Sequence, residues 1–485
     1  MLSDITPFRL AGNVFFVGTY KESSHLIDTG DGLILIDVGF EANADIVIDS
    51  MNELGYNVKD VKIILLSHGH GDHSEGAKKI ADISGASIYM FKEDMRYLNG
   101  KFTPDHFFSD GETISLGNTS ILCLHTPGHT AGTASFFFDV DINGTTYRAG
   151  TFGGASANQL RKPFLDARNI SYRMRGIFLD SIERLKKEHV DIFIGNHSRQ
   201  NKTLENSEIL RTTGVNPFID SSKWLEFLAS CEKHLDSVIE EEKRTMFVNY
   251  AHRGAQAYMP ENTLLSFYTG IAMNANGIET DVRRAKDGTL VLFHDDSLKR
   301  TTGEVGAVSD YTYDELRAFN VSHKGYSDKI ISLEEFLKYF SFRDITFAIE
   351  LKDSDIEKDV ADLLRKYDMS RKTVVTSFEF EYIKNFKAYA PEFRVGLLCF
   401  DPDEALEEQL KDIWADEICP KASTLTPDKI DRWHKLGFRV RAWGISDEEI
   451  MRTAYDMGVD GMTANFPDKL HEYILAKTQK NAEDV

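Results

Sequence analysis

The sequence predicts two domains in series, an α+β domain followed by an α/β barrel. The chain has 485 residues, which is too long for one ordinary hydrophobic core. The first half is rich in short strands joined by tight turns, whereas the second half alternates strand-like runs with helical stretches. We therefore expect one domain at residues 1–244 and another at residues 245–485.

The overall composition is that of a globular protein, with 42% apolar and 27% charged residues. The net charge of −21 is shared by both halves, which argues against nucleic acid and anionic membranes as partners. The four cysteines show neither a metal-binding nor a disulfide spacing. Residues 1–16 lack the pattern of a signal peptide, and no apolar run is long enough for a membrane span. These features predict a cytoplasmic protein, and they leave the oligomeric state open.

Short strands and helices alternate through the first half. The turn TGDG joins two apolar runs and predicts a hairpin. Beyond it we expect two helices and then further strands, at residues 43–54, 74–84, 86–91 and 112–124. An amphipathic, charged helix at 223–243 is predicted to close the domain, and no flexible linker follows it.

The most informative stretch of the first half is HGHGDH, residues 68–73, which follows an apolar strand. His68 and His70 stand at i and i+2, so an extended chain points both to the same side. The glycines between the histidines allow the tight backbone that a multidentate site requires. Asp72 and His73 then begin the next helix. Imidazole and carboxylate together suit zinc, with iron or manganese less favoured.

Two later histidines repeat this arrangement. His129 lies in the turn TPGHT after a strand, and His197 lies in GNH after the apolar run VDIFI. A single histidine after a strand is more often structural than a metal ligand. Several histidines delivered in this way by separate strands favour one shared metal site.

The HxHxDH run, the TPGHT turn and the late GNH together resemble the metallo-β-lactamase superfamily. The stretches PFRLAGNVFFVGT and NPFIDSSKWLEFL are similar to its β-lactamase subclass without a cysteine ligand. This resemblance implies an αββα sandwich that holds two zinc ions. It assigns one zinc to His68, His70 and His129, and the other to Asp72, His73 and His197.

One departure concerns Thr151, which stands where many superfamily members carry a bridging aspartate. The cysteine-free subclass also lacks that bridge, so the departure argues against glyoxalase-like and nuclease-like activities without implying inactivity. Paired zinc ions lower the pKa of water, so the implied reaction is hydrolysis. The substrate is not readable from the sequence. A zinc-stabilised docking module without activity and a true β-lactamase stay open as alternatives for this domain.

The second half contains nine strand-like runs, at residues 247–252, 277–282, 289–294, 345–351, 373–377, 394–399, 416–420, 438–445 and 459–464. The second and third runs are too close for a crossover helix, so we expect them to form a hairpin. Removing one partner of the hairpin leaves eight runs, most of them separated by helices. A (β/α)₈ barrel typically needs about 250 residues, so the second half has the right length for one.

Acidic residues in two of these strands predict a cation site. Glu279 and Asp281 stand at i and i+2 between apolar neighbours, and burying two carboxylates on one face is costly unless a cation neutralises them. Glu350 comes from another strand. Three carboxylates suit a hard cation, Mg²⁺ or Ca²⁺. His252 and His294 end two further strands.

The motifs AHRG, PENT, ETDV, LFHDD, RTTG and IELK together resemble the glycerophosphodiester phosphodiesterase family. The resemblance implies a small-molecule glycerophosphodiester substrate and release of sn-glycerol 3-phosphate and an alcohol, with attack first by the neighbouring glycerol hydroxyl. It makes His252 and His294 the acid–base pair and places the metal on Glu279, Asp281 and Glu350. It further implies that three residues bind the substrate, namely Arg253, Lys352 and Trp443.

The segments GISDEE and TANFP depart from the usual forms of the family, TVN and TDYP, on the substrate side of the barrel. These departures leave the head-group preference open. A sensor that binds phosphodiesters without hydrolysing them is a further alternative, which the complete set of catalytic residue types disfavours. The sequence as a whole therefore predicts a bifunctional metal-dependent hydrolase.

Overall fold

The computed structural model describes residues 6–483, and the chain divides into two compact units. The first unit consists of the chain up to Leu160 together with Ile177–Val238. The second unit consists of Arg161–Gly176 together with the chain from Ile239 onward. A single boundary after residue 244 does not describe these units, because a segment of the first half packs with the second. Residues 1–5, part of the stretch read for a signal peptide, lie outside the described residues.

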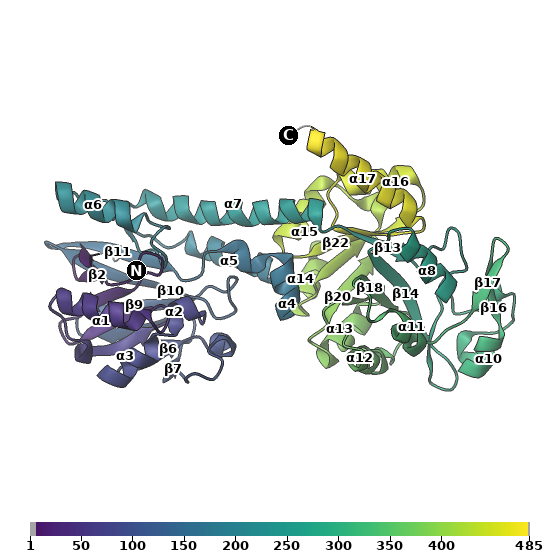
Figure 1. Ribbon diagram of the computed structural model, residues 1–485, viewed down its shortest axis with the longest axis horizontal. Helices are drawn as coiled ribbons and strands as arrows, with labels where there is room; N and C mark the ends of the chain where they lie inside the picture. Colours follow the sequence, from purple (N-terminus) through teal and green to yellow (C-terminus); the bar gives the residue numbers. More distant parts are fainter. Residues whose placement is uncertain (1–5, 484–485) are drawn as a thin grey trace. The chain divides into compact units, whose positions relative to one another are not determined.

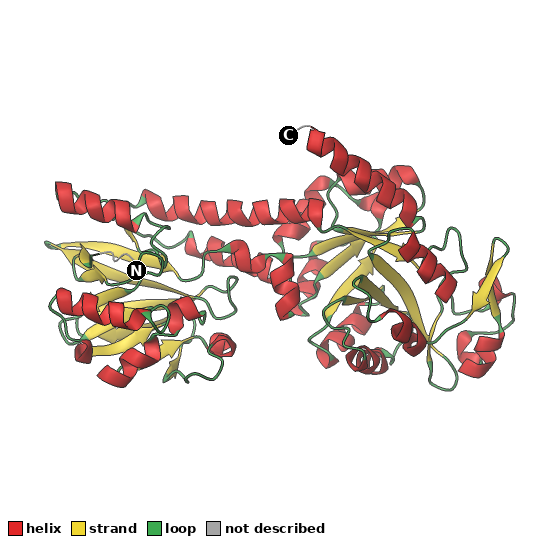
Figure 2. Ribbon diagram, viewed as in Figure 1, coloured by secondary structure: helices red, strands yellow, loops and turns green. Residues whose placement is uncertain are grey.

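The first unit contains two β-sheets (Figure 2). One sheet has the order β1-β2-β3-β4-β5-β6-β7, with strands at Phe8–Ala11, Val14–Phe16, His25–Asp28, Leu33–Ile36, Val61–Leu65, Ser87–Met90 and His106–Phe107. The other has the order β12-β11-β10-β9-β8, with strands at Ile192–Phe193, Thr145–Phe152, Ala134–Ile142, Thr119–His125 and Glu112–Leu116. The predicted TGDG hairpin is confirmed as the antiparallel pair β3 and β4.

Helices cover the outer faces of both sheets. The helices of this half are α1 Asn43–Glu53, α2 Gly71–Ser74, α3 Ala77–Ser84, α4 Lys162–Arg168, α5 Met174–Leu185, α6 Thr203–Thr213 and α7 Ser222–Thr245, with short 3₁₀ turns at Val58–Asp60, Lys92–Tyr97 and Ala157–Leu160. Val47 and Ile80, from α1 and α3, belong to the core on one outer face. On the other, the rings of Phe137 and Trp224 meet at 5.9 Å. Buried side chains from both sheets form a core between them, and the αββα sandwich is confirmed.

The second unit is built on a closed barrel (Figure 1). Its strands are β13 Val248–His252, β14 Gly277–Arg284, β15 Leu290–Leu292, β18 Thr346–Leu351, β19 Thr373–Ser377, β20 Arg394–Cys399, β21 Glu417–Pro420, β22 Arg439–Ile445 and β23 Gly461–Ala464. Strand β13 pairs with both β14 and β23, which closes eight parallel strands into a ring. Strand β15 pairs antiparallel with β14, as the short connection predicted. The (β/α)₈ barrel is confirmed.

Helices connect most of the barrel strands. They are α8 Leu264–Ala272, α9 Lys299–Thr302, α10 Tyr313–Ala318, α11 Leu333–Phe340, α12 Glu357–Lys366, α13 Phe380–Tyr389, α14 Glu404–Asp412, α15 Pro427–Lys435, α16 Glu448–Asp456 and α17 Pro467–Glu483, with 3₁₀ turns at Val308–Asp310 and Ala422–Thr424. A hairpin of β16 Asn320–His323 and β17 Tyr326–Lys329 lies between α10 and α11. Thr263 caps α8 by accepting a hydrogen bond from the Ser266 amide. Over the described part of the chain, no helix combines the length and the apolar character needed to span a bilayer.

Candidate functional sites

Six predicted metal ligands of the first unit meet at one point. They come from the segment after β5, from α2, from the turn after β9 and from the loop after β12. Ligand atoms of His68, His70 and His129 lie within 4.8 Å of one another, and so do those of His68, Asp72 and His73. Nε2 of His197 lies 3.3 Å from Nε2 of His73 and 3.8 Å from a carboxylate oxygen of Asp72.

Hydrogen bonds at Nδ1 orient three of these imidazoles. Nδ1 of His73 donates to Asp37 at 2.8 Å, that of His129 to the Ser156 carbonyl at 2.9 Å, and that of His197 to the Lys21 carbonyl at 3.0 Å. A histidine that donates through Nδ1 keeps the Nε2 lone pair for a metal ion. The donor set therefore fits zinc.

Burial keeps most of these imidazoles neutral. It lowers the pKa of His129 to about 3 and holds the pKa of His68 well below its ordinary value, and it also lowers the pKa of His197. Burial opposes a charge on His73 as well, but Asp37 raises the pKa of that residue overall. Neutral imidazoles are the form that binds metal, so the site is prepared for a cation at neutral pH.

Two buried aspartates support this cluster and were missed in the sequence. Asp37 follows β4 and accepts hydrogen bonds from the Ser67 amide at 2.7 Å and the Ser67 hydroxyl at 2.6 Å, besides that of His73. Its position, an acid directly after an apolar strand, was a readable signal. Asp94 offered none, because it bonds to loops that are distant in the sequence. Thr151 is buried on β11 opposite Phe136.

The predicted barrel residues lie at the carboxyl ends of neighbouring strands, where barrel active sites are built. His252 on β13 is in register with Glu279 on β14, and Asp281 is in register with Glu350 on β18. Ligand atoms of the three carboxylates lie within 4.8 Å of one another. His294 follows β15. A cavity of about 360 Å³ is lined by His252, Arg253, Glu279, His294, Glu350 and Trp443, among others.

The carboxylate cluster has the properties of a cation site. Burial and the neighbouring Asp281 raise the pKa of Glu279 to about 8, and the same two causes raise that of Glu350 to about 7. Among the described residues, Asp281 is fully buried and its Oδ1 has no hydrogen-bond partner. Three buried carboxylates with one unpartnered oxygen fit a hard cation such as Mg²⁺ or Ca²⁺.

The two candidate acid–base histidines are held by hydrogen bonds. Nδ1 of His252 donates to the Asn465 side chain at 2.6 Å, and Nδ1 of His294 donates to Asp295 at 2.6 Å. Nε2 of His252 lies 3.8 Å from Glu279. Burial lowers the pKa of His252 to about 3 and also lowers the pKa of His294.

Both predicted phosphate-binding cations lie beside the carboxylates. Nε of Arg253 is 3.1 Å from Asp281, and Nζ of Lys352 is 2.7 Å from Glu350 and 3.7 Å from Asp281. Trp443 borders the cavity, and its indole N–H donates to the Cys399 carbonyl at 3.0 Å.

The segments that depart from the family's usual forms contribute to the cavity as well. Gly444, Ile445 and Ser446 belong to GISDEE, Asn465 belongs to TANFP, and all four line the cavity. The predicted substrate side is therefore part of this pocket.

Several supporting residues of the barrel site had no predicted role. Asn262 donates to Asp281 at 2.9 Å, and Glu261 accepts from Arg253 at 3.0 Å. Arg300 bonds to Glu261 and also pairs with Asp295 at 2.5 Å. The motifs PENT, LFHDD and RTTG contain these residues, so the signal was in the sequence, but the contacts were not.

Comparison with protein families identifies both halves. The description "Glycerophosphoryl diester phosphodiesterase family" matches residues 252–469, and "Metallo-beta-lactamase superfamily" matches residues 17–141. The glycerophosphodiester phosphodiesterase of Bacillus altitudinis is 32% identical over 232 residues, which cover 45% of this chain and 95% of that protein. Uncharacterized protein YqiK of Bacillus subtilis is also 32% identical, over 231 residues and the same shares of both chains.

Solved structures similar to this chain include the native FEZ-1 metallo-beta-lactamase from Legionella gormanii. It has 29% sequence identity and a TM-score of 0.46, and the match covers 50% of this chain and 98% of that chain.

Proposed function

The chain belongs to the glycerophosphoryl diester phosphodiesterase family through residues 252–469, and we propose that its barrel hydrolyses glycerophosphodiesters to sn-glycerol 3-phosphate and an alcohol. The observation that supports this proposal most directly is the convergence of two histidines, three carboxylates and two cations at one end of the barrel. His252, His294 and the carboxylates Glu279 and Glu350 line the same cavity.

The proposed roles follow from the surroundings of each side chain. His252 and His294 exchange protons with the attacking and leaving oxygens, because each ring is fixed at Nδ1 and keeps Nε2 for the substrate. Arg253 and Lys352 bind the phosphate oxygens. A divalent cation held by Glu279, Asp281 and Glu350 supplies electrostatic stabilisation of the phosphoryl group. Trp443 contacts the alcohol or glycerol portion of the substrate.

Histidine substitutions test the barrel activity. Assayed on a panel of glycerophosphodiesters with Mg²⁺ or Ca²⁺, His252→Ala and His294→Ala should each lose roughly 10²-fold to 10⁴-fold in kcat. His323→Ala, in the β16–β17 hairpin, is the control and should keep wild-type activity. The proposal fails if the wild-type chain turns over none of the panel with any divalent ion, or if His252→Ala stays fully active.

The first half carries a metallo-beta-lactamase superfamily domain, a metal-dependent hydrolase fold. We propose that it binds two zinc ions, one at His68, His70 and His129 and the other at Asp72, His73 and His197, and that it hydrolyses a substrate of its own. Support comes from the close approach of all six side chains and from burial, which lowers the pKa of His68, His129 and His197.

Metal analysis tests this second proposal. Purified protein should contain two zinc ions in this domain and one exchangeable Mg²⁺ or Ca²⁺ in the barrel, and His129→Ala and His197→Ala should each lose about one zinc. Absence of any transition metal would contradict the dinuclear site.

A panel of lactones, thioesters, phosphodiesters and β-lactams then distinguishes the possible activities of this domain. Failure of the whole panel with zinc retained favours a docking module, and ordinary turnover of a penicillin or carbapenem, about 10⁴ M⁻¹s⁻¹ or more in kcat/KM, favours a β-lactamase.

A further inference from the structure

Residues 161–176 close the amino-terminal end of the barrel, although they belong to the first half of the sequence. Tyr172 is 1% exposed, and its amide donates to Asp416 at 3.1 Å. The guanidinium carbons of Arg394 and Arg439 lie 4.8 and 5.5 Å from the centre of the Tyr172 ring. The segment therefore brings an aromatic ring against two buried cations.

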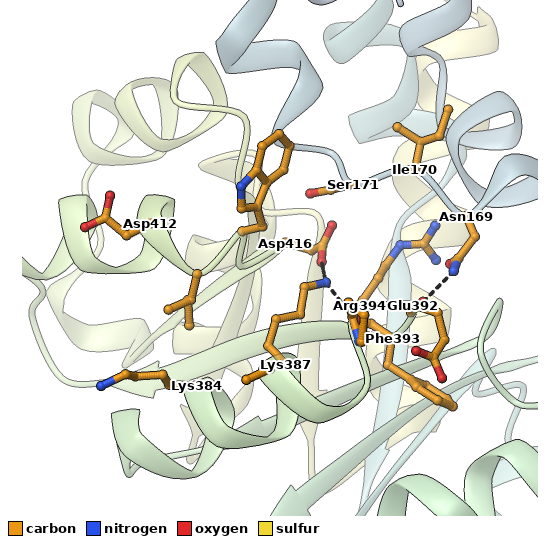
Figure 3. A pocket seen from close by; sticks show the side chains of 14 residues that line it. Asn169, Ile170, Ser171, Lys384, Lys387, Glu392, Phe393, Arg394, Asp412 and Asp416 are labelled. Carbon is orange, nitrogen blue, oxygen red and sulfur yellow. Dashed lines mark hydrogen bonds and ion pairs between the residues drawn. The ribbon is translucent and has the colours of Figure 1, made fainter. Parts of the chain in front are cut away.

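Asn169 and Asp166 give the segment further contacts with the barrel, and Figure 3 shows the contact between Asn169 and Glu392. The Asn169 amide donates to the Glu392 carbonyl at 2.5 Å, and Asp166 forms an ion pair with Arg394 at 2.8 Å. These contacts fix the segment by its side chains as well as by its backbone.

A cavity of about 320 Å³ lies against the segment. Five of its lining residues are the first residues of consecutive barrel strands, β18 to β22, namely Thr346, Thr373, Arg394, Glu417 and Arg439. The candidate catalytic residues lie at the opposite ends of the barrel strands, so this floor cavity is distinct from the catalytic cavity.

Buried hydrogen-bond donors without partners line the floor cavity. Among the described residues, the hydroxyls of Tyr250 and Thr373 and Nε of Arg394 are buried and have no hydrogen-bond partner. Tyr250 and Thr373 are each 1% exposed, and Arg394 is 8% exposed. A buried donor without an acceptor destabilises a fold, so three around one cavity indicate that something with acceptor atoms belongs there.

The charges around the floor cavity specify the acceptor further. Five lining residues are basic (Lys162, Arg371, Lys372, Arg394 and Arg439) and three are acidic (Asp166, Asp344 and Glu417), which leaves a surplus of two positive charges. An anion would balance this surplus, whereas a neutral ligand would not. Arginine and hydroxyl donors together are the groups that bind oxyanions.

We propose that the floor cavity binds a small oxyanion of the phosphate class, either inorganic phosphate or a phosphate monoester. Its oxygens accept hydrogen bonds from Tyr250, Thr373 and Arg394 and neutralise the surplus charge. Because Arg394 also pairs with Asp166, the bound anion stabilises residues 161–176 on the barrel. This binding does not depend on the activity of either candidate active site.

Hydrogen–deuterium exchange of the full chain tests the proposal locally, with sodium phosphate or sn-glycerol 3-phosphate compared with sodium chloride at equal ionic strength. Some amides exchange only in an open state that has lost the bound anion. At an anion concentration ten times the dissociation constant, hydrogen exchange at these amides slows by about elevenfold. We expect this slowing at residues 161–176 with at least one of the two anions. The two arms show whether free phosphate or a monoester is preferred.

Conservative variants supply the controls. Thr373→Val and Tyr250→Phe each remove one unpartnered hydroxyl and should weaken anion binding by about tenfold, as expected for a hydrogen bond to a charged group. At the same anion concentration, the slowing of exchange should then fall from about elevenfold to about twofold. Thr376→Val is the matched control, because Thr376 lies on the same strand, its hydroxyl is also buried without a partner among the described residues, and it does not line the cavity. Equal protection in wild type and in both cavity variants, or no protection by either anion, would overturn the proposal.

Discussion

Asp295 connects a candidate catalytic histidine to the cations around it. It accepts a hydrogen bond from His294 at 2.6 Å and pairs with Arg300, which in turn binds Glu261 beside Arg253. Burial opposes the charge on Asp295, but Arg300 and His294 lower its pKa to about 2. Asp295 is therefore ionised at neutral pH and holds the imidazole of His294 in one orientation.

Asp295→Asn should lower kcat with little change in KM. The Asp295 hydrogen bond raises the pKa of His294 against the opposing effect of burial, so the substitution lowers that pKa further. The limb of the pH–rate profile that His294 controls should then move to lower pH. Asp296→Asn is the neighbouring control. A variant profile that superimposes on the wild type would show that Asp295 does not position His294.

A second residue-scale effect concerns His25 on β3. It is 2% exposed, and its Nε2 has no hydrogen-bond partner among the described residues. Burial lowers its pKa to about 3 from an ordinary value of 6.5. Below pH 6.5, His25 therefore binds a proton in the unfolded chain but not in the folded chain. The stability that depends on neutral His25 is fully present above pH 6.5 and is lost as pH falls toward 3.

His25→Phe should flatten this acid dependence. From pH 6 to pH 4, the free energy of unfolding should fall more steeply for the wild type than for His25→Phe. The difference in slope should be up to about 1.4 kcal/mol per pH unit, the value for one proton. Denaturation of both proteins at several pH values measures the difference. Parallel curves would contradict the assignment of a neutral, buried His25.

At the scale of secondary-structure elements, the 3₁₀ turn Lys92–Tyr97 holds together, through Asp94, two loops that carry candidate metal ligands. This carboxylate is fully buried and accepts hydrogen bonds from the Gly69 amide at 2.8 Å, the Thr130 hydroxyl at 2.8 Å and the Gly132 amide at 2.7 Å. Gly69 separates His68 from His70, and Thr130 follows His129. One side chain thus sets the distance between ligands from distant parts of the sequence.

Asp94→Ala should weaken zinc binding in the first unit by about 10-fold to 100-fold, the usual effect of removing a supporting group. The substitution leaves the ligands themselves intact, so the loss reports on their placement. Competition with a chelator gives the affinity, and the exposed neighbour Glu93 supplies the control Glu93→Ala. Unchanged zinc affinity in Asp94→Ala would show that the loops hold their positions without it.

At the scale of the whole molecule, the two halves of the sequence are not the two compact units of the structure. Residues 161–176 leave the first unit, pack on the amino-terminal end of the barrel, and return. Tyr172 is buried there, and Gly176 has no room for a side chain, because an added Cβ would lie 2.3 Å from the Leu436 carbonyl oxygen. The stability of the barrel therefore depends on residues far outside its own sequence.

Tyr172→Ala should destabilise the barrel by roughly 3–5 kcal/mol, the range for removing a large buried aromatic side chain. Thermal inactivation of the phosphodiesterase measures the effect, and the exposed Arg168 in the same segment gives the control Arg168→Ala. If Tyr172→Ala inactivates at the wild-type temperature, the segment is dispensable for the barrel.

The sequence alone determined the architecture and most of the candidate site residues. Alternation of strand and helix, together with one connection too short for a helix, was enough for the (β/α)₈ barrel and its β14–β15 hairpin. The candidate ligands were readable because His68, His129 and Glu279 stand in or after apolar strands. Parallel barrel strands end at one shared edge, which brings Glu279 to its partners, whereas His68 and His129 follow strands of different sheets that only the fold brings together. Local periodicity carries this kind of information, since it depends on neighbours along the chain.

Only the tertiary structure decided which side chains support those sites and where the units divide. Asp94 gained its role from partners that folding brings to it, and Tyr172 lies in a polar stretch that shows no sign of a burial site on the barrel. The floor cavity likewise exists only where residues 161–176 meet the first residues of five strands. Hydrogen bonds and packing between residues distant in sequence leave no local pattern, because their energy depends on positions that the fold alone establishes.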